Sequence, residues 1–179
     1  MSIEKVRQYF QPLGREQDIL EFETSSATVE LAAQAAGVIP ARIAKTLSFL
    51  VDEGCVLIVT AGDAKIDNSK FKAMFHAKAK MLSPEQVYSF TGHAVGGVCP
   101  FANPDGVRTY LDVSLQRFET VFPAAAAATP RSSSPVTSWR STPTAWDGST
   151  CARAGRRPPD PVFPSERSAL FPWRQKTVS

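Results

Sequence analysis

The chain has 179 residues, of which 43% are hydrophobic and 21% charged, a balance typical of a folded globular domain. No apolar run approaches the ~20 residues that span a membrane, and three widely spaced cysteines suit neither a disulfide framework nor a zinc site. The net charge of +3 comes from the end of the chain, because residues up to Pro123 carry 12 basic and 14 acidic side chains. The charge therefore does not indicate a globally basic nucleic-acid-binding surface, although it leaves local basic patches open.

The N-terminal segment predicts two helices separated by a short strand. Its first residues alternate in charge and lack the apolar core of a signal peptide, so we expect a cytoplasmic location. Residues 3–13 place apolar side chains at helical spacing, and residues 19–23 alternate as a half-buried strand. The Ala-rich stretch 28–36 predicts the second helix, which Gly37 ends.

A β-hairpin is predicted next. Residues 43–51 and 55–60 are apolar runs rich in β-branched side chains, and Asp52, Glu53 and Gly54 form the turn between them. The second run is too apolar to face water, so we expect it to be buried.

The remaining elements predict two further helices and two closing strands. A lysine-bearing helix is expected over residues 68–75, and Ser83 with Pro84 begins another. A glycine-rich segment follows at 92–100, and strands are expected at 107–113 and 120–122. Short helices mixed with hairpins indicate an α/β domain with a mixed, partly antiparallel sheet and short surrounding helices.

Four stretches of this part, taken in order and with their spacing, resemble the motifs of one known family. They contain a helix start followed by a lysine-bearing strand, a Gly-Asp turn before a helix, a Gly-x-x-x-Pro loop and a strand ending at an aspartate. These stretches are residues 28–47, 60–70, 92–100 and 111–115. On these motifs, residues 1–123 resemble the YbaK-like prolyl-tRNA-editing domains, which are aminoacyl-tRNA deacylases.

The resemblance implies trans-editing, the hydrolysis of the ester that joins a wrong amino acid to the 3′ end of a tRNA. The expected partner is a mischarged tRNA, for proline or a similar one; a synthetase is a second candidate partner, and no membrane is involved. This family is understood to hydrolyse without a covalent nucleophile, a metal or another cofactor. The chain agrees with that pattern, since it offers only His76 and His93 and no convincing Ser-His-Asp set or metal-ligand cluster.

Lys45 is the residue that we expect to be catalytic. It interrupts an apolar strand, and its ammonium could orient the aminoacyl carbonyl or the phosphate of the terminal nucleotide. The alternative is a strand lysine that simply points to solvent. The residues expected to bind substrate are Thr28, Gly62, Asp63, Gly96, Gly97, Pro100 and Asp112.

Several of the substrate-binding candidates also have an ordinary structural interpretation. The glycines of the loop at 96–100 can expose backbone N–H groups to a carbonyl oxygen, or they can form a tight connection. Gly62 and Asp63 can form a plain turn. Asp112 can bind an amino group or merely end a strand.

Other residues near these motifs are assigned less specific roles. We expect His93 to be a hydrogen-bonded loop residue and Cys99 a small apolar residue, since no base is visibly paired with the thiol. A cluster of lysines could contact acceptor-stem phosphates or could form a solvated surface. This lysine cluster consists of Lys65, Lys70, Lys72, Lys78 and Lys80.

The family pattern is lost after Pro123. Residues 124–179 hold 8 of the 14 prolines, with many Ser, Thr and Arg residues, and favour a disordered tail. Read in a shifted frame from Ala125, GC-rich synonymous codons encode Gly-Ser-Ser-Asn-Ser-Ala-Ile-Glu-Leu, which matches the loop and strand that the family has there. We therefore predict a domain over residues 1–123 and hypothesise that the tail is a frameshift product.

The altered tail leaves three functional interpretations open. The chain is an active deacylase, a catalytically silent module that binds aminoacyl-tRNA or a synthetase, or an inactive truncated deacylase. The third interpretation arises because the buried surface lost with the altered tail can be worth as much free energy as a domain's whole stability. Resequencing the gene across the codons for residues 123–130 tests the frameshift. An unshifted sequence with no lost base would contradict it.

Overall fold

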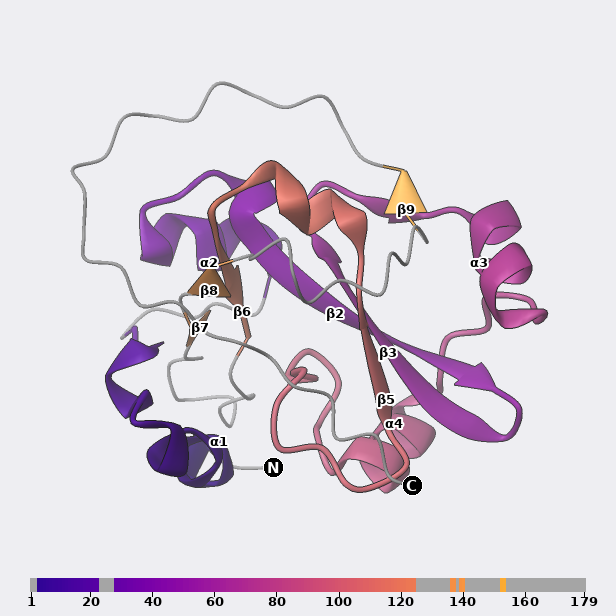
Figure 1. Cartoon of the computed structure of the whole chain (residues 1–179), viewed down its shortest axis with the longest axis horizontal. Coiled ribbons are helices and arrows are strands. Elements are labelled where there is room, and N and C mark those ends of the chain that lie inside the picture. Colours follow the sequence, from indigo (N-terminus) through magenta and orange to yellow (C-terminus); the bar gives the residue numbers. More distant parts are fainter. Residues whose placement is uncertain (1–2, 23–27, 125–135, 138, 141–151, 154–179) are drawn as a thin grey trace.

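The computed structural model of the chain describes residues 3–22, 28–124, 136–137, 139–140 and 152–153. Within these residues the chain forms short α-helices around one central sheet (Figure 1). The α-helices are α1 (Ile3–Phe10), α2 (Val29–Ala36), α3 (Asn68–Phe75) and α4 (Pro84–Thr91). The sheet has the spatial order β5 (Arg108–Leu111), β3 (Gly54–Ala61), β2 (Ile43–Val51), β6 (Thr120–Pro123) and β8 (Trp139–Arg140).

The sheet is mixed, as the sequence predicts. β2 and β3 form an antiparallel hairpin that runs from the pair Ala44–Ala61 to the pair Val51–Gly54. β6 lies parallel to β2 on one side, and β5 lies parallel to β3 on the other. β8 is antiparallel to β6. The α/β class with a mixed, partly antiparallel sheet is therefore confirmed.

Two strand pairs lie outside the central sheet. β1 (Ile19–Leu20) pairs with β7 (Val136–Thr137), and β4 (Lys65–Ile66) pairs with β9 (Ala152–Arg153). Short pieces of the chain beyond residue 124 thus lie beside strands of the first part. Most of the tail, on which the disorder and frameshift hypotheses fall, lies outside the described residues, and the domain boundary at 123 stays a prediction.

The helices begin and end where their local chemistry dictates. The Thr28 hydroxyl accepts a hydrogen bond from the backbone of α2, and Gly37 ends that helix with φ of 64°. Asp67 caps α3 through its side chain. Ser83 and Gln86 form a reciprocal capping box at the start of α4, which confirms the helix start expected there.

Three elements are shorter than the sequence suggests, each for a local reason. The helix expected over 3–13 ends at Phe10 and continues as a 3-10 turn, because Pro12 has no N–H for an α-helical bond. The strand expected over 19–23 pairs over two residues only, and residue 23 lies outside the described ones. The strand expected over 107–113 ends before Asp112, because that side chain caps the following 3-10 helix η4 (Val113–Arg117).

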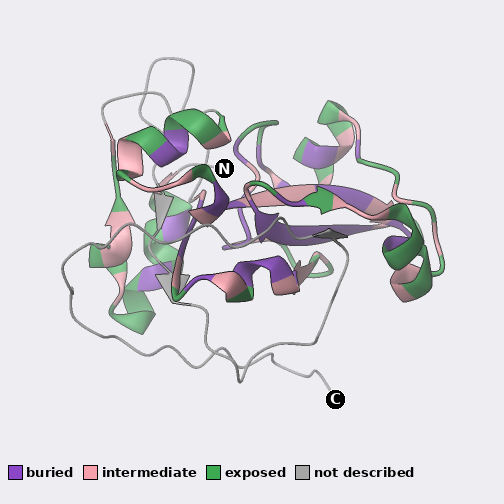
Figure 2. Cartoon of the chain, turned by 90° about the horizontal axis from the view of Figure 1, so that it is seen from above, coloured by how far each residue is buried: buried purple, intermediate pink, exposed green. Residues whose placement is uncertain are grey.

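The second strand of the central hairpin, β3, is buried on both of its faces (Figure 2). Val56 and Ile58 pack in one cluster with Phe71 of α3, whereas Cys55 and Leu57 pack in another with Val87 of α4. Since successive side chains of a strand point to opposite faces, α3 and α4 cover opposite faces of this part of the sheet. The burial expected for residues 55–60 is therefore confirmed.

The end of β3 lies against the turn that precedes β2. Gly62 follows β3 directly, and its N–H donates to the carbonyl of Ala41, 3.4 Å away, in the 3-10 helix η3 (Pro40–Arg42). A Cβ at Gly62 would lie 2.1 Å from the Pro40 carbonyl oxygen and 2.7 Å from Cγ1 of Val29. No L-side chain fits there, so glycine is required by space.

The Gly62→Ala variant is expected to lose about 1–3 kcal/mol of unfolding free energy, because the nearest obstructing atom is the backbone carbonyl oxygen of Pro40, which must move. Urea unfolding of the full chain measures this loss. Gly54→Ala is the matched control, since its Cβ would meet only the Val51 carbonyl at an ordinary 3.5 Å. Equal stability of the two variants would contradict the close approach.

Candidate functional site

Lys45 lies on β2 with its ammonium held by the turn that follows β3. Its Nζ donates hydrogen bonds to the carbonyl oxygens of Gly62 at 2.9 Å and Ala64 at 2.5 Å. The side chain is half-buried, and this burial lowers the pKa of Lys45, while the nearby Asp63 carboxylate acts in the opposite direction. Lys45 therefore does not simply point to solvent.

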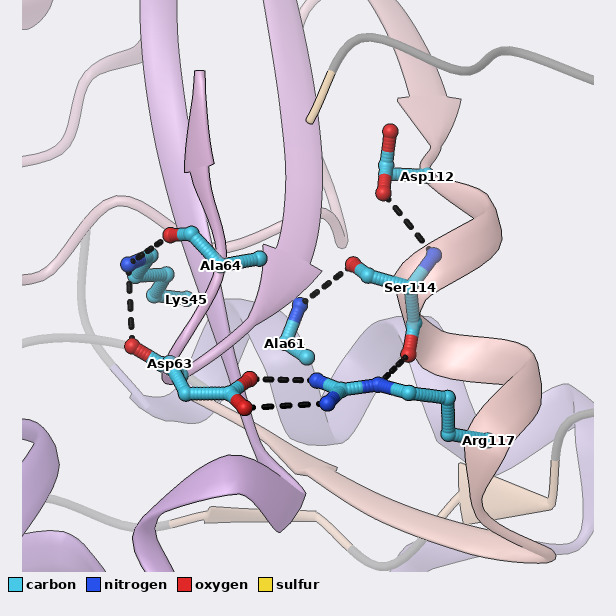
Figure 3. Close-up of polar contacts among 8 residues, drawn as sticks. Lys45, Ala61, Asp63, Ala64, Asp112, Ser114 and Arg117 are labelled. Atoms are coloured by element: carbon cyan, nitrogen blue, oxygen red, sulfur yellow. Dashed lines mark hydrogen bonds and ion pairs between the residues drawn. The ribbon is translucent and has the colours of Figure 1, made fainter. Parts of the chain in front are cut away.

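Asp63 lies between the two carbonyls that hold Lys45, but its own side chain turns to Arg117. The guanidinium of Arg117 on η4 forms two hydrogen bonds to the Asp63 carboxylate, one of them 2.9 Å long (Figure 3). Hydrogen bonding to Arg117 lowers the pKa of the Asp63 carboxyl, so that it is a carboxylate over a wide pH range. Gly62 and Asp63 do form a turn, and the turn also positions Lys45.

Asp112 and Ser114 fasten η4 to the end of β3. The fully buried Asp112 accepts a hydrogen bond from the backbone N–H of Ser114 at 2.8 Å, and its own N–H donates to the Val59 carbonyl at 2.9 Å. The Ser114 hydroxyl accepts from the backbone N–H of Ala61 at 3.0 Å. Asp112 therefore ends β5 and caps η4, and a role in substrate binding stays a prediction.

Thr28 contributes a helix cap at the exposed start of α2. Its Oγ1 accepts a hydrogen bond from the backbone N–H of Leu31 at 3.2 Å. The residue before it in the chain lies outside the described residues. The capping bond explains the Thr at this position without a substrate, so its binding role also stays a prediction.

The glycine-rich loop joins α4 to β5 and belongs to a different set of contacts. Gly96 is exposed with φ of 85°, and the Gly97 N–H donates to the Ala94 carbonyl at 3.0 Å. Pro100 is buried, and the neighbouring Cys99 packs in a cluster with residues of α1. Hydrogen bonds among the described residues thus unite Lys45 with Gly62 and the turn around Asp63, whereas this loop is anchored to α1.

His93 and Cys99 form the buried base of this loop. Burial lowers the pKa of His93 to about 4 and raises the pKa of Cys99 to about 12. The Cys99 Sγ lies 3.6 Å from the His93 Nε2, and Sγ also contacts the carbonyl oxygen of Phe101 at 3.4 Å. At neutral pH both groups are uncharged, which fits the expectation of a loop histidine and a small apolar cysteine.

Sequence reasoning did not find Arg117 and Ser114. Arg117 is 54 positions from Asp63, and no local pattern marks an arginine in a 3-10 helix as the partner of a distant turn. The only local signal is the spacing of Asp112 and Ser114, which is typical of a side chain that caps the backbone two residues later.

In the part of the chain that the structure describes, no three His, Cys, Asp or Glu side chains lie close enough together to hold a metal ion. No described helix is long and apolar enough to cross a bilayer.

Solved structures with the same fold include a proposed trans-editing enzyme for prolyl tRNA synthetase. It superposes with a TM-score of 0.65 and 28% identity, over 76% of this chain and 88% of that protein. The hypothetical protein APE2540 superposes with a TM-score of 0.64 and 25% identity over the same shares. The α/β fold around the Lys45 strand is thus one that editing proteins use.

Sequence comparisons extend this similarity to curated proteins. The chain is 57% identical over 125 residues to the uncharacterized protein YwhH of Bacillus subtilis (strain 168), covering 69% of this chain and 80% of YwhH. It is 31% identical over 86 residues to the proline–tRNA ligase of Leuconostoc citreum (strain KM20), which is 48% of this chain and 15% of the ligase. Residues 23–136 match the model of the aminoacyl-tRNA editing domain, and the chain therefore belongs to that family.

Proposed function

We propose that the chain hydrolyses mischarged aminoacyl-tRNA in trans, by cleaving the ester between the amino acid and the terminal ribose. The observation that carries this proposal is the half-buried Lys45 ammonium, fixed by two backbone carbonyls in a chain of the editing-domain family. Ester hydrolysis needs a positioned water, stabilisation of the developing oxyanion and a pocket that selects the amino acid.

Lys45 suits the second of these tasks. An ammonium has three N–H donors, and in this structure two of them go to the carbonyls of Gly62 and Ala64. The third can donate to the carbonyl oxygen of the substrate ester, where negative charge grows as water attacks. A fixed cation in a half-buried position stabilises this charge more strongly than a cation that moves freely in water.

The other predicted site residues would form the surroundings of the ester. In this proposal the exposed Gly96, on the loop that also holds Gly97 and Pro100, contributes a backbone N–H group, while Thr28 contacts the aminoacyl or nucleotide part. The left-handed backbone at Gly96 supports the first assignment, because such a conformation can expose N–H groups on one side.

Two similarities support a tRNA for proline as the substrate. The chain matches a segment of a proline–tRNA ligase, and one structural relative is a proposed trans-editing enzyme for prolyl tRNA synthetase. A synthetase that delivers the mischarged tRNA is a second candidate partner in this proposal.

The Lys45→Met variant is expected to lose about 10²–10³-fold in the rate constant for deacylation, because it removes the cation that faces the oxyanion. A panel of mischarged tRNAs, including mischarged tRNA for proline, measures the rate as loss of the labelled amino acid. Lys5→Met is the matched control, since Lys5 is exposed on α1 and is expected to leave the rate unchanged.

Equal background hydrolysis by wild type and Lys45→Met would overturn the hydrolase proposal. In that case tRNA binding without turnover favours the catalytically silent module. Recovery of turnover after the tail is restored in its alternate frame favours the inactive truncated deacylase.

The lysine cluster supplies a surface for the acceptor stem. All five of its lysines are exposed, and Asp67 is the one acidic residue between positions 64 and 82. The Asp67 carboxylate accepts hydrogen bonds from the backbone N–H groups of Ser69 and Lys70 at the start of α3. This segment is therefore positively charged, and its first lysine, Lys65 on β4, lies close enough to act electrostatically on Lys45.

The double variant Lys70→Gln/Lys72→Gln is expected to weaken tRNA binding and to flatten its salt dependence. The slope of log affinity against log salt concentration should fall by roughly 0.7–0.9 for each lost phosphate contact. Fluorescence anisotropy with uncharged tRNA at several salt concentrations measures this slope, with Lys5→Gln as the control. An unchanged slope would indicate that the cluster is only a solvated surface.

A further inference from the structure

The Asp63 carboxylate, which acts electrostatically on the Lys45 ammonium, is hydrogen-bonded to an arginine. Asp63 lies in the turn between Gly62 and Ala64, whose carbonyls accept from Lys45, yet its carboxylate faces Arg117 (Figure 3). A carboxylate beside an ammonium normally pairs with it. The turn therefore contains a carboxylate that could pair with Lys45 but that is bound by the Arg117 guanidinium.

Arg117 is itself rigidly placed. Its side chain is 12% exposed, its Nε donates to the Ser114 carbonyl at 2.9 Å, and its guanidinium lies 5.1 Å from the centre of the Phe118 ring. Two parallel hydrogen bonds from a planar guanidinium fix the orientation of a carboxylate more firmly than a single bond does. The Asp63 side chain thus has one defined direction.

The same short helix holds the turn at a second point. While Arg117 binds Asp63, the Ser114 hydroxyl accepts from the backbone of Ala61 at 3.0 Å, just before the turn. The chain between these two anchors contains the Gly62 carbonyl that binds Lys45. A change at Arg117 therefore reaches Lys45 both through the backbone and through the released carboxylate.

We propose that Arg117 is a positioning residue for Lys45: it fixes the turn carbonyls and holds the Asp63 carboxylate away from the ammonium, which keeps one N–H of Lys45 for the substrate. This inference rests on the proposed function and deepens it, because it assigns Asp63 the role of a restrained counter-charge instead of a substrate ligand. Without Arg117, Asp63 pairs with Lys45 and neutralises the cation that the reaction uses.

The activity test compares Arg117→Gln with the double variant Arg117→Gln/Asp63→Asn. We expect kcat for deacylation to fall roughly 10- to 100-fold in Arg117→Gln, with KM little changed, because Lys45 is misdirected after substrate is bound. The double variant should recover much of kcat, since it has no carboxylate to capture Lys45. If the ion pair only stabilised the fold, the double variant would be no more active than Arg117→Gln, and this result would overturn the proposal.

A second measurement does not depend on activity. The pKa of Lys45 can be measured by an NMR titration of the full chain, in which the Cε carbons of the lysines are isotope-labelled. The Lys45 signal is identified as the one that is absent from the spectrum of Lys45→Met. The charges that face Lys45 are those of Asp63, Lys65 on β4 and Glu30 on α2. Because a carboxylate favours the protonated ammonium, the titration should move to higher pH in Arg117→Gln and back in the double variant.

The two measurements test the two proposals separately. A wild-type chain without deacylase activity would refute the proposed function, while the Lys45 titration would still test the positioning role of Arg117. Identical Lys45 titration in wild type, Arg117→Gln and the double variant would refute the positioning role even in an active enzyme.

Two controls keep the result interpretable if Arg117→Gln is unstable. Arg117→Lys retains the charge but not the two-pronged contact, so its kcat should lie between those of wild type and Arg117→Gln. Arg108→Gln removes an exposed arginine from β5 and should leave both kcat and the Lys45 titration unchanged. Thermal unfolding of each variant shows that the comparison is made on folded protein.

Discussion

No side chain fits between the end of β3 and the turn that precedes β2. At Gly62 the backbone lies so close to the Pro40 carbonyl that only a residue without a Cβ is accommodated. This contact brings the turn after β3 close to the start of β2. There the carbonyls of Gly62 and Ala64 accept hydrogen bonds from the ammonium of Lys45. The geometry of the candidate site is therefore set by main-chain packing before any polar side chain contributes.

Features that depend on neighbouring residues could be predicted from the sequence. The helix start at Ser83, the glycine that ends α2 and the hairpin turn at 52–54 each have their cause within a few positions. The apolar run of β3 also predicted burial correctly, because both of its faces are covered by helices. The parallel pairing of β6 with β2 has no such local cause, since it joins residues as distant in the chain as Ile43 and Phe122.

The candidate site was predictable only in part for the same reason. Lys45 stands out in the sequence as a cation inside an apolar strand, and a Gly-Asp pair stands out as a turn. That the turn binds the lysine and that Asp63 binds Arg117 depends on contacts across the fold. Side-chain direction decides the role of Asp63, and spacing along the chain does not contain that information.

Lys45 shows how a protein can hold a cation without neutralising it. Burying an ammonium is costly unless hydrogen bonds replace its water, and a carboxylate partner would supply such bonds but would cancel the charge. Here two carbonyl dipoles of the turn solvate Lys45, while the carboxylate between them is turned to Arg117. Dipoles lower the cost of burial and leave the net charge in place. A substrate oxygen that becomes negative during hydrolysis would then meet a full positive charge, whereas a Lys45–Asp63 ion pair would offer it little attraction.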